Sequence, residues 1–336
     1  MAYYDWLFNS LGLRQWCDEG KGEALVSLRS LMKKEAPWYE IPFPSLDNLH
    51  AACDRLWQTR DLTVGLREGF LGIKPYLRLV LDPLTQPLSW MLEGALWLFT
   101  SMPWYVLVPL LLALTQYVTR KAGITLFVAI CFAFLSIIDH YTVTIETLSI
   151  IFVCTILCVL FGVPIGIAMS KSDRLEKGLI PVLDILQTLP SFVYLIPLIF
   201  LFSVTEPKIY GIAIILYAIV PVVRLTNLGI RLVDKDVKEA GNAFGMNRWQ
   251  MLFGLEIPLA LPNIMAGVNQ TIMMALAMVV IASLVSAPGL GTLVLDGINN
   301  LRLGVGFVAG FGIVMIAVIL DRVTKAALAR INSAQQ

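Results

Sequence analysis

Long apolar runs separated by short polar breaks dominate the chain from residue 104 onward. A helix needs roughly 20 apolar residues to cross the hydrocarbon core of a bilayer, and the pattern predicts seven spans. They lie at about 104–119, 122–138, 142–169, 179–203, 208–231, 260–286 and 305–322. The alternating positions typical of barrel strands are absent from the sequence, so we expect helices, which satisfy their own backbone hydrogen bonds in lipid. The predicted fold class is an all-α membrane protein.

The chain before these spans is different in character. Residues 1–75 mix tryptophan, proline and charge, and predict a non-membrane tail with short helices at about 20–35 and 45–60. Residues 76–101 are amphipathic and include Asp82, Pro83, Pro87 and Glu93. This pattern predicts an interfacial helix that lies along the membrane better than it predicts a span.

Charge at the polar breaks indicates the orientation. Lysine and arginine gather at every second break, and they favour the cytoplasmic side of a membrane. The basic breaks contain Arg120 and Lys121, then Lys171, Arg174 and Lys177, then Arg231, Lys235, Lys238 and Arg248, and finally Arg322, Lys325 and Arg330. Seven spans with a cytoplasmic C-terminus place the N-terminal tail outside. If residues 85–101 also span, the tail lies inside instead.

Composition agrees with a bilayer as the solvent. The 336-residue chain is 57% hydrophobic and has a mean hydropathy of +0.76. Its formal net charge of +1 offers no basic footprint for nucleic acid. The two histidines, His50 and His140, are isolated, and the sequence contains neither metal-ligand spacing nor a nucleophile–base arrangement. We therefore expect a protein without a metal site or enzyme activity.

The five cysteines fall into different settings. Cys154 and Cys158 lie four residues apart in an apolar run, and we interpret them as small apolar side chains of a membrane helix. Cys17 and Cys53 lie in the polar tail. They can form a disulfide if the tail faces an oxidising compartment.

One polar break, residues 232–258, is longer and more ordered than a connector requires. Asp236, followed three residues later by Glu239, forms an N-terminal capping arrangement. We expect a helix from Val237 to about Phe244. Gly245 then stands where a left-handed C-terminal cap needs glycine.

A second helix is predicted beyond this glycine. Asn247 and Gln250 repeat the capping spacing, and Pro258 and Pro262 are expected to close the helix before the next span. One of its faces carries Trp249, Leu252, Phe253 and Glu256. A helix, glycine turn and helix on the cytoplasmic side can dock in a groove of a partner and transmit its movement. An ordinary amphipathic hairpin fits the local chemistry equally well.

The same stretch resembles the EAA loop of ABC importer permeases. That motif reads Glu-Ala-Ala, three residues, Gly, nine residues, then Ile-x-Leu-Pro. The matching residues are Glu239-Ala240-Gly241, Gly245 and Leu255-Glu256-Ile257-Pro258. Gly241 replaces the second alanine and should loosen the first helix by up to about 1 kcal/mol. Leu255 and Ile257 are conservative replacements.

The resemblance implies a type I importer fold in the bacterial inner membrane, with a permease core at 142–330 and accessory spans at 104–138. Its coupling contact with a separate ATPase would involve Glu239, Ala240, Gly241, Gly245 and Pro258. The sequence contains no G-x-x-x-x-G-K-[ST] phosphate loop. ATP and Mg are then expected on the partner, and no cofactor on this chain. The other implied partners are an external binding protein and a second copy of the chain, because a dimeric ATPase has two grooves.

Further segments resemble glycine betaine/proline permeases, namely 181–200, 258–283 and 288–298. The resemblance implies import of glycine betaine, proline or a related compatible solute. Choline, carnitine and dimethylsulfoniopropionate remain open, as do methionine, sulfonates or phosphonates in the same architecture. An ATP-independent secondary transporter is a more distant alternative, and it would be expected to carry repeated intramembrane acids for ion coupling.

Glycine and proline are frequent inside the spans, which indicates close helix packing or a bent bundle around a passage. The candidates to line the passage are Gln187, Thr188, Phe192, Tyr194, Asn269, Gln270, Thr271 and Ser283. Their polar atoms are costly in lipid, so they should face the bundle interior, either at the passage or in hydrogen bonds between helices. Asp184 and Arg224 are expected near the cytoplasmic side, and Glu146 near the outer side.

Overall fold

The computed structural model describes residues 4–13, 17, 43–53 and 56–335, and the regular elements in these residues are all helices. The chain divides into two units, Met1–Leu77 and Arg78–Gln336. A predominantly helical architecture is what the apolar periodicity predicts.

The described part of the first unit includes the short helices α1 Asp5–Ser10 and α4 Leu46–His50. The Ser45 hydroxyl caps α4 by accepting a hydrogen bond from the Asn48 amide at 3.3 Å. A disulfide joins Cys17 to Cys53 inside a small apolar cluster, so the pair that the sequence left conditional is formed. The helix predicted at 45–60 is shorter than expected, and the one predicted at 20–35 lies outside the described residues.

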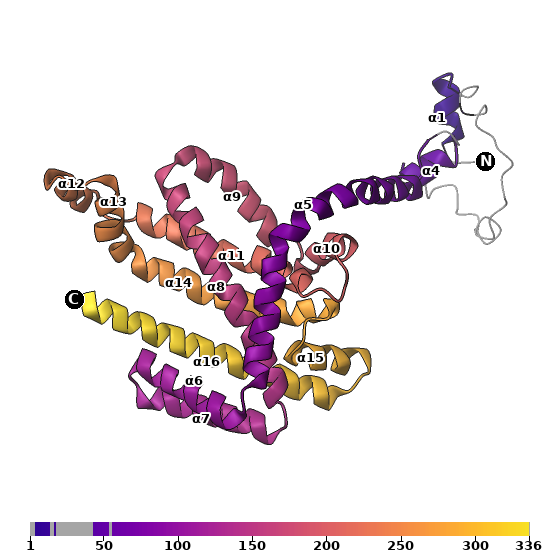
Figure 1. Ribbon diagram of the computed structural model, residues 1–336. Coiled ribbons are helices and arrows are strands. Elements are labelled where there is room, and N and C mark those ends of the chain that lie inside the picture. The colour runs from indigo at the N-terminus through magenta and orange to yellow at the C-terminus, as the bar shows by residue number, and fades with distance from the viewer. Residues whose placement is uncertain (1–3, 14–16, 18–42, 54–55, 336) are drawn as a thin grey trace. The chain divides into compact units, whose positions relative to one another are not determined.

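Helix α5, Thr59–Ser101, begins in the first unit and continues into the second. The second unit also contains the helices of the predicted spans and of the loop between them (Figure 1). They are α6 Trp104–Thr119, α7 Ala122–Ile137, α8 Tyr141–Lys171, α9 Asp173–Thr188, α10 Leu195–Leu201, α11 Lys208–Arg231, α12 Lys235–Ala243, α13 Arg248–Met251, α14 Ile257–Ala282, α15 Leu290–Asn299 and α16 Leu303–Gln335.

Among the described residues, four continuous helical segments are long and apolar enough to cross a membrane. They are α8, α11, the segment Arg248–Val285 that contains α14, and α16. The pairs α5–α6 and α9–α10 qualify only when each is joined across a sharp bend, and α7 is a shorter apolar helix. Each predicted span therefore corresponds to a helix or to part of a bent pair, and the total of seven crossings stays a prediction.

The span expected at 179–203 is wrong as a single helix. The chain turns by 104° between α9 and the segment Ser191–Leu201. Leu189 is extended, with φ −64° and ψ 133°, because the residue before a proline is disfavoured in the helical region. Pro190 then leads into a short 3₁₀ turn and α10. Hydropathy continues through this point and gives no sign of the break.

The prolines expected to close the second helix of the loop do not end it. Helix runs without a break from Arg248 through a π-helical turn, Leu252–Glu256, into α14. The ring of Pro258 would clash with a carbonyl of the preceding turn in a regular helix. A π turn at this position displaces that carbonyl, so the helix passes through Pro258 instead of stopping there.

Helix α11 is the centre of the second unit, with α8 and α14 as its main neighbours. A Cβ atom on Gly166 of α8 would lie 2.7 Å from the Val223 carbonyl oxygen, and one on Gly267 of α14 would lie 3.0 Å from the Val222 Cα. Both contacted residues belong to α11. Small residues allow such close backbone approach in membrane bundles, which explains why glycine is frequent in these spans.

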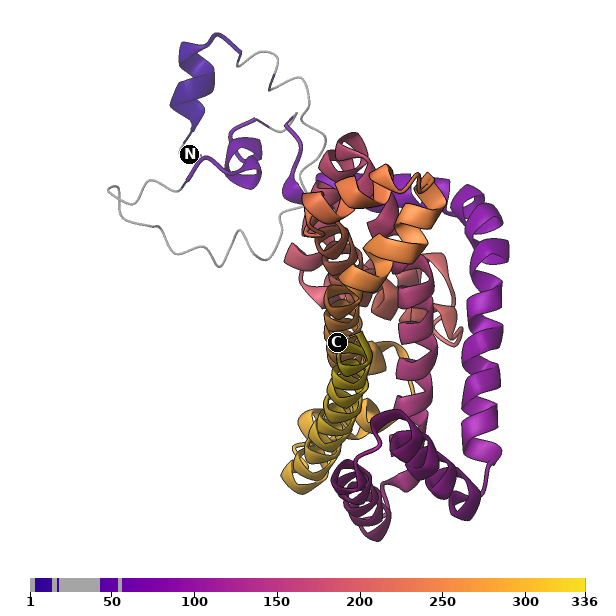
Figure 2. The same ribbon diagram turned by 90° about the vertical axis from the view of Figure 1, so that its left-hand side faces the viewer.

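The basic breaks gather at one end of the second unit. Lys171 at the end of α8 pairs with Glu256 beside the loop, and Arg231 at the end of α11 pairs with Asp173 at the start of α9. Arg330 of α16 donates to the Tyr117 carbonyl oxygen at the end of α6. The helices α12 and α13 and the C-terminal end of α16 lie on the same side in Figure 1, and this side faces the viewer in Figure 2.

Candidate functional site

The loop between α11 and α14 forms a helical elbow, α12–α13. Asp234 caps α12 by accepting from the Asp236 amide at 3.0 Å. The prediction that Asp236 and Glu239 form the cap is therefore wrong, because Asp236 already lies in the first turn. Gly245 has φ +75°, and the Met246 amide donates to the Gly241 carbonyl oxygen at 3.1 Å. This is the left-handed C-terminal cap that the sequence predicts.

The second helix of the elbow begins as predicted. The Gln250 amide donates to the Asn247 side chain at 2.8 Å, and the Asn247 amide donates to the Gln250 side chain at 2.9 Å. This reciprocal arrangement is a capping box. It fixes α13 directly after the glycine turn, so the angle of the elbow is set by local chemistry.

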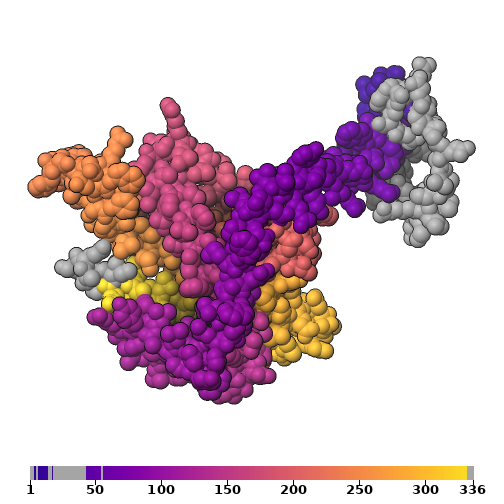
Figure 3. Space-filling model, viewed as in Figure 1, coloured from indigo at the N-terminus to yellow at the C-terminus, as the bar shows by residue number. Residues whose placement is uncertain are grey.

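The elbow exposes an aromatic surface. Phe244, Trp249 and Phe253 are 85%, 70% and 60% exposed, and the rings of Trp249 and Phe253 stack with centroids 5.8 Å apart. Glu239 and Ala240 are also exposed. Figure 3 shows the elbow projecting from the bundle. Large apolar side chains on a projecting element indicate a protein contact.

Gly241, by contrast, is buried against the second half of the elbow. A Cβ atom here would lie 2.7 Å from the Met251 Cε and 3.4 Å from the Leu255 Cδ1. Glycine at this position therefore permits close packing of α12 on the segment that follows. Glycine lowers the helix propensity of α12, as expected from the sequence, but it also allows α12 to contact Met251 and Leu255 closely.

Glu256 connects three elements at the base of the elbow. It is 4% exposed and pairs with Lys171 at the end of α8. The Nζ of Lys238, on α12, lies 3.9 Å from the Glu256 carboxylate and 3.1 Å from the Ile230 carbonyl oxygen of α11. A buried carboxylate is costly without its cationic partners. Movement of α12 should therefore be transmitted to α8, α11 and α14 through these contacts.

The face predicted to hold Trp249, Leu252, Phe253 and Glu256 is split in the structure. Leu252 and Glu256 are buried, whereas Trp249 and Phe253 are exposed. Leu252 and Glu256, four residues apart, lie on the buried edge of this face, and Trp249 and Phe253, also four residues apart, lie on its exposed edge. A lone acid in an apolar stretch after a basic break is the signal that could have identified Glu256.

The predicted passage residues occupy two different environments. Thr188, Phe192 and Gln270 are exposed in the single chain, and Gln187 is half-buried with its amide 3.8 Å from the Met274 sulfur. Asn269 is half-buried and donates to Asp321 of α16 at 3.0 Å. The buried members are Tyr194, Thr271 and Ser283. The Tyr194 hydroxyl donates to the Leu186 carbonyl oxygen, and Ser283 to the Val279 carbonyl oxygen.

A charged network joins α5 to the start of α11, at the end opposite the elbow. Asp82 accepts from Arg78 at 2.8 Å and from Lys208 at 2.5 Å. Glu206 lies 2.7 Å from Lys208 and 3.4 Å from Arg78. Lys208 is 3% exposed, and its Nζ lies 4.7 Å from the centre of the Phe202 ring.

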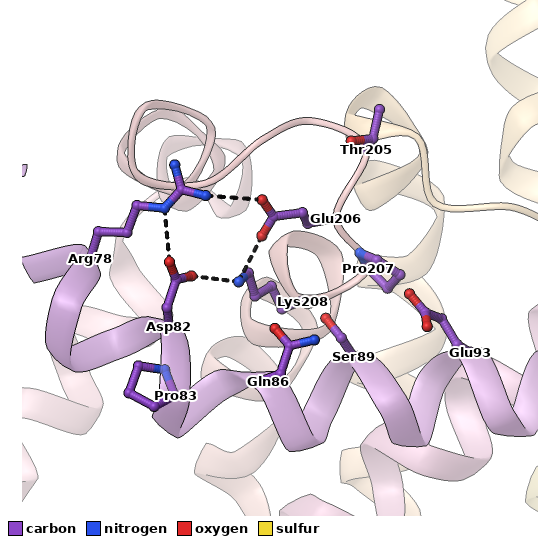
Figure 4. A pocket seen from close by; sticks show the side chains of 10 residues that line it. All are labelled: Arg78, Asp82, Pro83, Gln86, Ser89, Glu93, Thr205, Glu206, Pro207 and Lys208. Atoms are coloured by element: carbon purple, nitrogen blue, oxygen red, sulfur yellow. Dashed lines mark hydrogen bonds and ion pairs between the residues drawn. The ribbon is translucent and has the colours of Figure 1, made fainter. Parts of the chain in front are cut away.

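The same residues line a cavity of about 460 Å³ (Figure 4). The hydrogen bonds from Lys208 and Arg78 lower the pKa of the Asp82 carboxyl from its usual value. The network therefore holds this part of α5 against the bundle by charge. Arg78 and Asp82 have the i,i+4 spacing of a helical ion pair, but nothing in the sequence connects them with Glu206 and Lys208, which lie far along the chain.

Comparison with known proteins assigns this architecture. Residues 159–333 match the family model described as "Binding-protein-dependent transport system inner membrane component". The chain belongs to this family. The permease has the fold of a type I ABC importer subunit, because it is similar to the solved MetNI methionine ABC transporter in inward-facing conformations. That match has a TM-score of 0.51 and 16% identity, and it covers 55% of this chain and 93% of the other.

Curated relatives extend the similarity over most of the permease. The glycine betaine/proline betaine transport system permease protein ProW of Escherichia coli (strain K12) is 38% identical over 260 residues, which are 77% of this chain and 73% of that protein. The glycine betaine/carnitine transport permease protein GbuB of Listeria monocytogenes serotype 1/2a (strain 10403S) is 39% identical over 263 residues, with coverage of 77% and 89%. The permease is a multi-pass transport subunit, and an importer of this type works with an ATPase and a binding protein.

Proposed function

We propose that the permease imports glycine betaine or a closely related compatible solute such as proline. This proposal rests on the solutes named for its curated relatives. Besides the two proteins above, the glycine betaine transport system permease protein OpuAB of Bacillus subtilis (strain 168) is 40% identical over 221 residues. The three relatives share glycine betaine as a named solute. A solute with a methylated onium group is selected by aromatic faces through cation–π attraction, and we place this selection on the external binding protein.

ATP, with Mg, would be bound and hydrolysed on the partner ATPase. The exposed surface of the elbow, with Glu239, Ala240 and the aromatic side chains Trp249 and Phe253, would dock in a groove of that ATPase. Gly245 and Pro258 would set the direction of the two helices. When two ATPases close on ATP, α12 would move with them, and the Glu256 junction would pass this movement to α8 and α14.

The basic end of the second unit would be cytoplasmic, together with the loop 232–258 and the C-terminus. Three observations support an external N-terminal tail. The Cys17–Cys53 disulfide is a bond that persists in oxidising compartments. Helix α5 meets α6 at 109°, which fits an interfacial helix at 76–101 beside an accessory span. Trp90 and Trp97 are 64% and 70% exposed, as expected for an aromatic helix at a membrane surface.

Two copies of the permease would enclose the passage, related by a two-fold axis. The single chain has one elbow, and two ATPase grooves need two. Thr188, Phe192 and Gln270 would line the passage with Gln187 because they are exposed in a single chain, on α9, the 3₁₀ turn Ser191–Tyr194 and α14. The buried Tyr194, Thr271 and Ser283 would instead hold the wall together.

The test is solute uptake into proteoliposomes that contain the permease, its ATPase and its binding protein. We expect ATP-dependent uptake of labelled glycine betaine, and loss of both uptake and ATPase co-purification in Glu239→Lys. The control is Arg302→Gln, at the other end of the bundle, where Arg302 is 65% exposed. Uptake that persists without the ATPase would overturn the proposal and favour a secondary transporter.

A wider set of onium solutes is supported by one further relative. The trimethylamine N-oxide transport system permease protein TmoV of Ruegeria pomeroyi is 40% identical over 195 residues, 58% of this chain and 30% of that protein. Competition in the uptake assay by choline, carnitine, trimethylamine N-oxide and methionine would rank these solutes. Stronger competition by methionine than by unlabelled glycine betaine would place the permease in a different solute class.

A further inference from the structure

Asp184 of α9 and Arg224 of α11 form an ion pair between two helices of the bundle. The Arg224 Nη2 donates to the Asp184 Oδ1. At about 3.6 residues per turn, Asp184 lies about three turns beyond the start of α9, and Arg224 about two turns before the end of α11. Both charges are therefore deeper than the basic breaks at the end of the bundle.

The accessibility of this pair is unusual for its depth. The side chains of Asp184 and Arg224 are 52% and 38% exposed in a single chain. Charges that face hydrocarbon cost about 2.5–3.5 kcal/mol each at the centre of a membrane helix. This side of α9 and α11 is therefore expected to face water or protein. Intramembrane charges in that position typically mark a solute or ion pathway.

The pair is not required to align its two helices. Arg231 already joins α11 to α9 nearer the end of the bundle, with contacts of 2.8 Å to Asp173 and 2.9 Å to Glu176. Asn227 adds a hydrogen bond of 2.7 Å to Glu176. In contrast, the Arg224 Nε is buried with no acceptor among the described residues. Its guanidinium thus keeps donor capacity that Asp184 does not use.

We propose that Asp184 and Arg224 form a transient binding site for a zwitterionic solute in the passage, an inference that rests on the proposed function. Arg224 would bind the solute carboxylate, for which the planar guanidinium offers paired donors. Asp184 would attract the methylated onium group of a betaine, which has no N–H and therefore binds by charge alone. Gln187 and Thr188, one turn further along α9, add polar groups beside the pair.

The energetics suit a passage. Without solute, the two side chains neutralise each other. A bound zwitterion replaces each partner by an equal charge, so the net charge of the site does not change. When the solute binds, the Asp184–Arg224 pair is replaced by two ion pairs, one between the solute and each side chain. The Asp184–Arg224 pair forms again when the solute leaves. Such a site binds weakly and releases readily, as transport requires.

The test is import into proteoliposomes by the complete complex of permease, ATPase and binding protein. The variants are Asp184→Asn, Arg224→Gln and the double exchange Asp184→Arg with Arg224→Asp. We expect each single variant to lower the initial rate of glycine betaine import by about 10- to 100-fold, in line with the loss of a charge-assisted hydrogen bond. The double exchange restores an ion pair between α9 and α11. It should recover assembly and basal ATPase activity without recovering import.

The matched control is Arg231→Gln, which removes the two ion pairs of Arg231 with α9 and should leave import within about twofold of the parent, because these pairs lie at the partly solvent-exposed end of the bundle, where ion pairs contribute little. Import by the double exchange at the parent rate would show that the pair is structural and would overturn the site. Undiminished import by both single variants would do the same. Failure of the unmodified complex to import glycine betaine would instead refute the proposed function.

Discussion

At the scale of single residues, charge placement is the feature that distinguishes this permease from a simple apolar bundle. Glu256 is 4% exposed and lies between Lys171 and Lys238. Its position in the fifth residue of the π turn directs the carboxylate inward, toward α8 and α12. A residue held in this way can transmit force without touching either solute or nucleotide.

Glu256→Gln should weaken the link between the elbow and the bundle. The amide keeps the shape of the side chain but removes the charge that both lysines face. We expect unfolding free energy to fall by about 1–3 kcal/mol, the range for losing a hydrogen bond to a charged group in a buried setting. More ATP should be hydrolysed per solute imported. The ATPase would still turn over, but the weakened junction at Glu256 would transmit less of its movement to α14. Thermal unfolding and coupled uptake–hydrolysis assays measure the two effects.

Asp296→Asn is the control for this change, because Asp296 of α15 pairs with Arg302 at 3.5 Å at the end of the bundle opposite the elbow. Its ratio of ATP hydrolysed to solute imported should equal that of the parent. If Glu256→Gln also kept the parental ratio, Glu256 would be a stability residue without a part in coupling.

At the scale of elements, the elbow combines local rigidity with an exposed surface. The cap at Gly245, the capping box of Asn247 and Gln250, and the stacked rings of Trp249 and Phe253 all form within the loop itself. The elbow therefore does not depend on a partner for its shape. Preorganisation of this kind reduces the cost of docking.

Trp249→Ala combined with Phe253→Ala should remove most of the proposed docking surface. Exposed aromatic side chains on an interface often dominate its affinity, so we expect ATPase affinity to fall by at least about tenfold, which corresponds to about 1.4 kcal/mol. Both side chains are exposed, and thermal stability of the isolated permease should change little. Titration of the ATPase onto detergent-solubilised permease measures the affinity.

The control is Phe307→Ala, since Phe307 is 76% exposed on α16 and lies away from the elbow. This variant should bind the ATPase as the parent does. Equal affinity for the double variant and the parent would place the docking contact elsewhere on the permease.

At the scale of the whole molecule, the single chain leaves polar and charged groups accessible at membrane depth. Lipid offers no partners for the exposed polar groups of Asp184, Arg224, Thr188 and Gln270. In the proposed dimer, a second copy would enclose them. The close packing of α8, α11 and α14 around Gly166 and Gly267 makes this part of the permease rigid. In the proposed dimer, the two copies would then move against each other as rigid halves.

The intact complex should contain two permease chains and two ATPase chains. Mass measurement of the detergent-solubilised complex, under conditions that keep subunits together, gives the stoichiometry directly. Its control is the same sample after dissociation, which should release permease of the single-chain mass. A complex with one permease chain would contradict the two-fold arrangement and leave the elbow unmatched to a second groove.

Much of the fold is predictable because its determinants are local. The bounds of α8 and α11 agree closely with the predicted spans at 142–169 and 208–231, since long apolar runs end at charge. Gly245 and the Asn247–Gln250 box are also read correctly, because φ preference and capping act over a few residues. The break at Pro190 was missed because hydropathy records burial in lipid and not helix direction.

The site was predictable only in part. The sequence identifies the elbow through its motif and proposes polar residues for the passage. It does not pair Asp184 with Arg224, place Glu256 between Lys171 and Lys238, or join Asp82 to Lys208. These partners come from different helices, and which side chains meet depends on how the helices are rotated and shifted against one another.

By itself, the sequence determined that this chain is a helical membrane protein with a glycine-hinged elbow, because apolar length, capping and glycine φ preference act within single segments. The tertiary structure decided which charges meet and which remain accessible. Ion pairs act over a few ångströms and between distant segments, so their partners are fixed only when α8, α9, α11 and α14 have packed together.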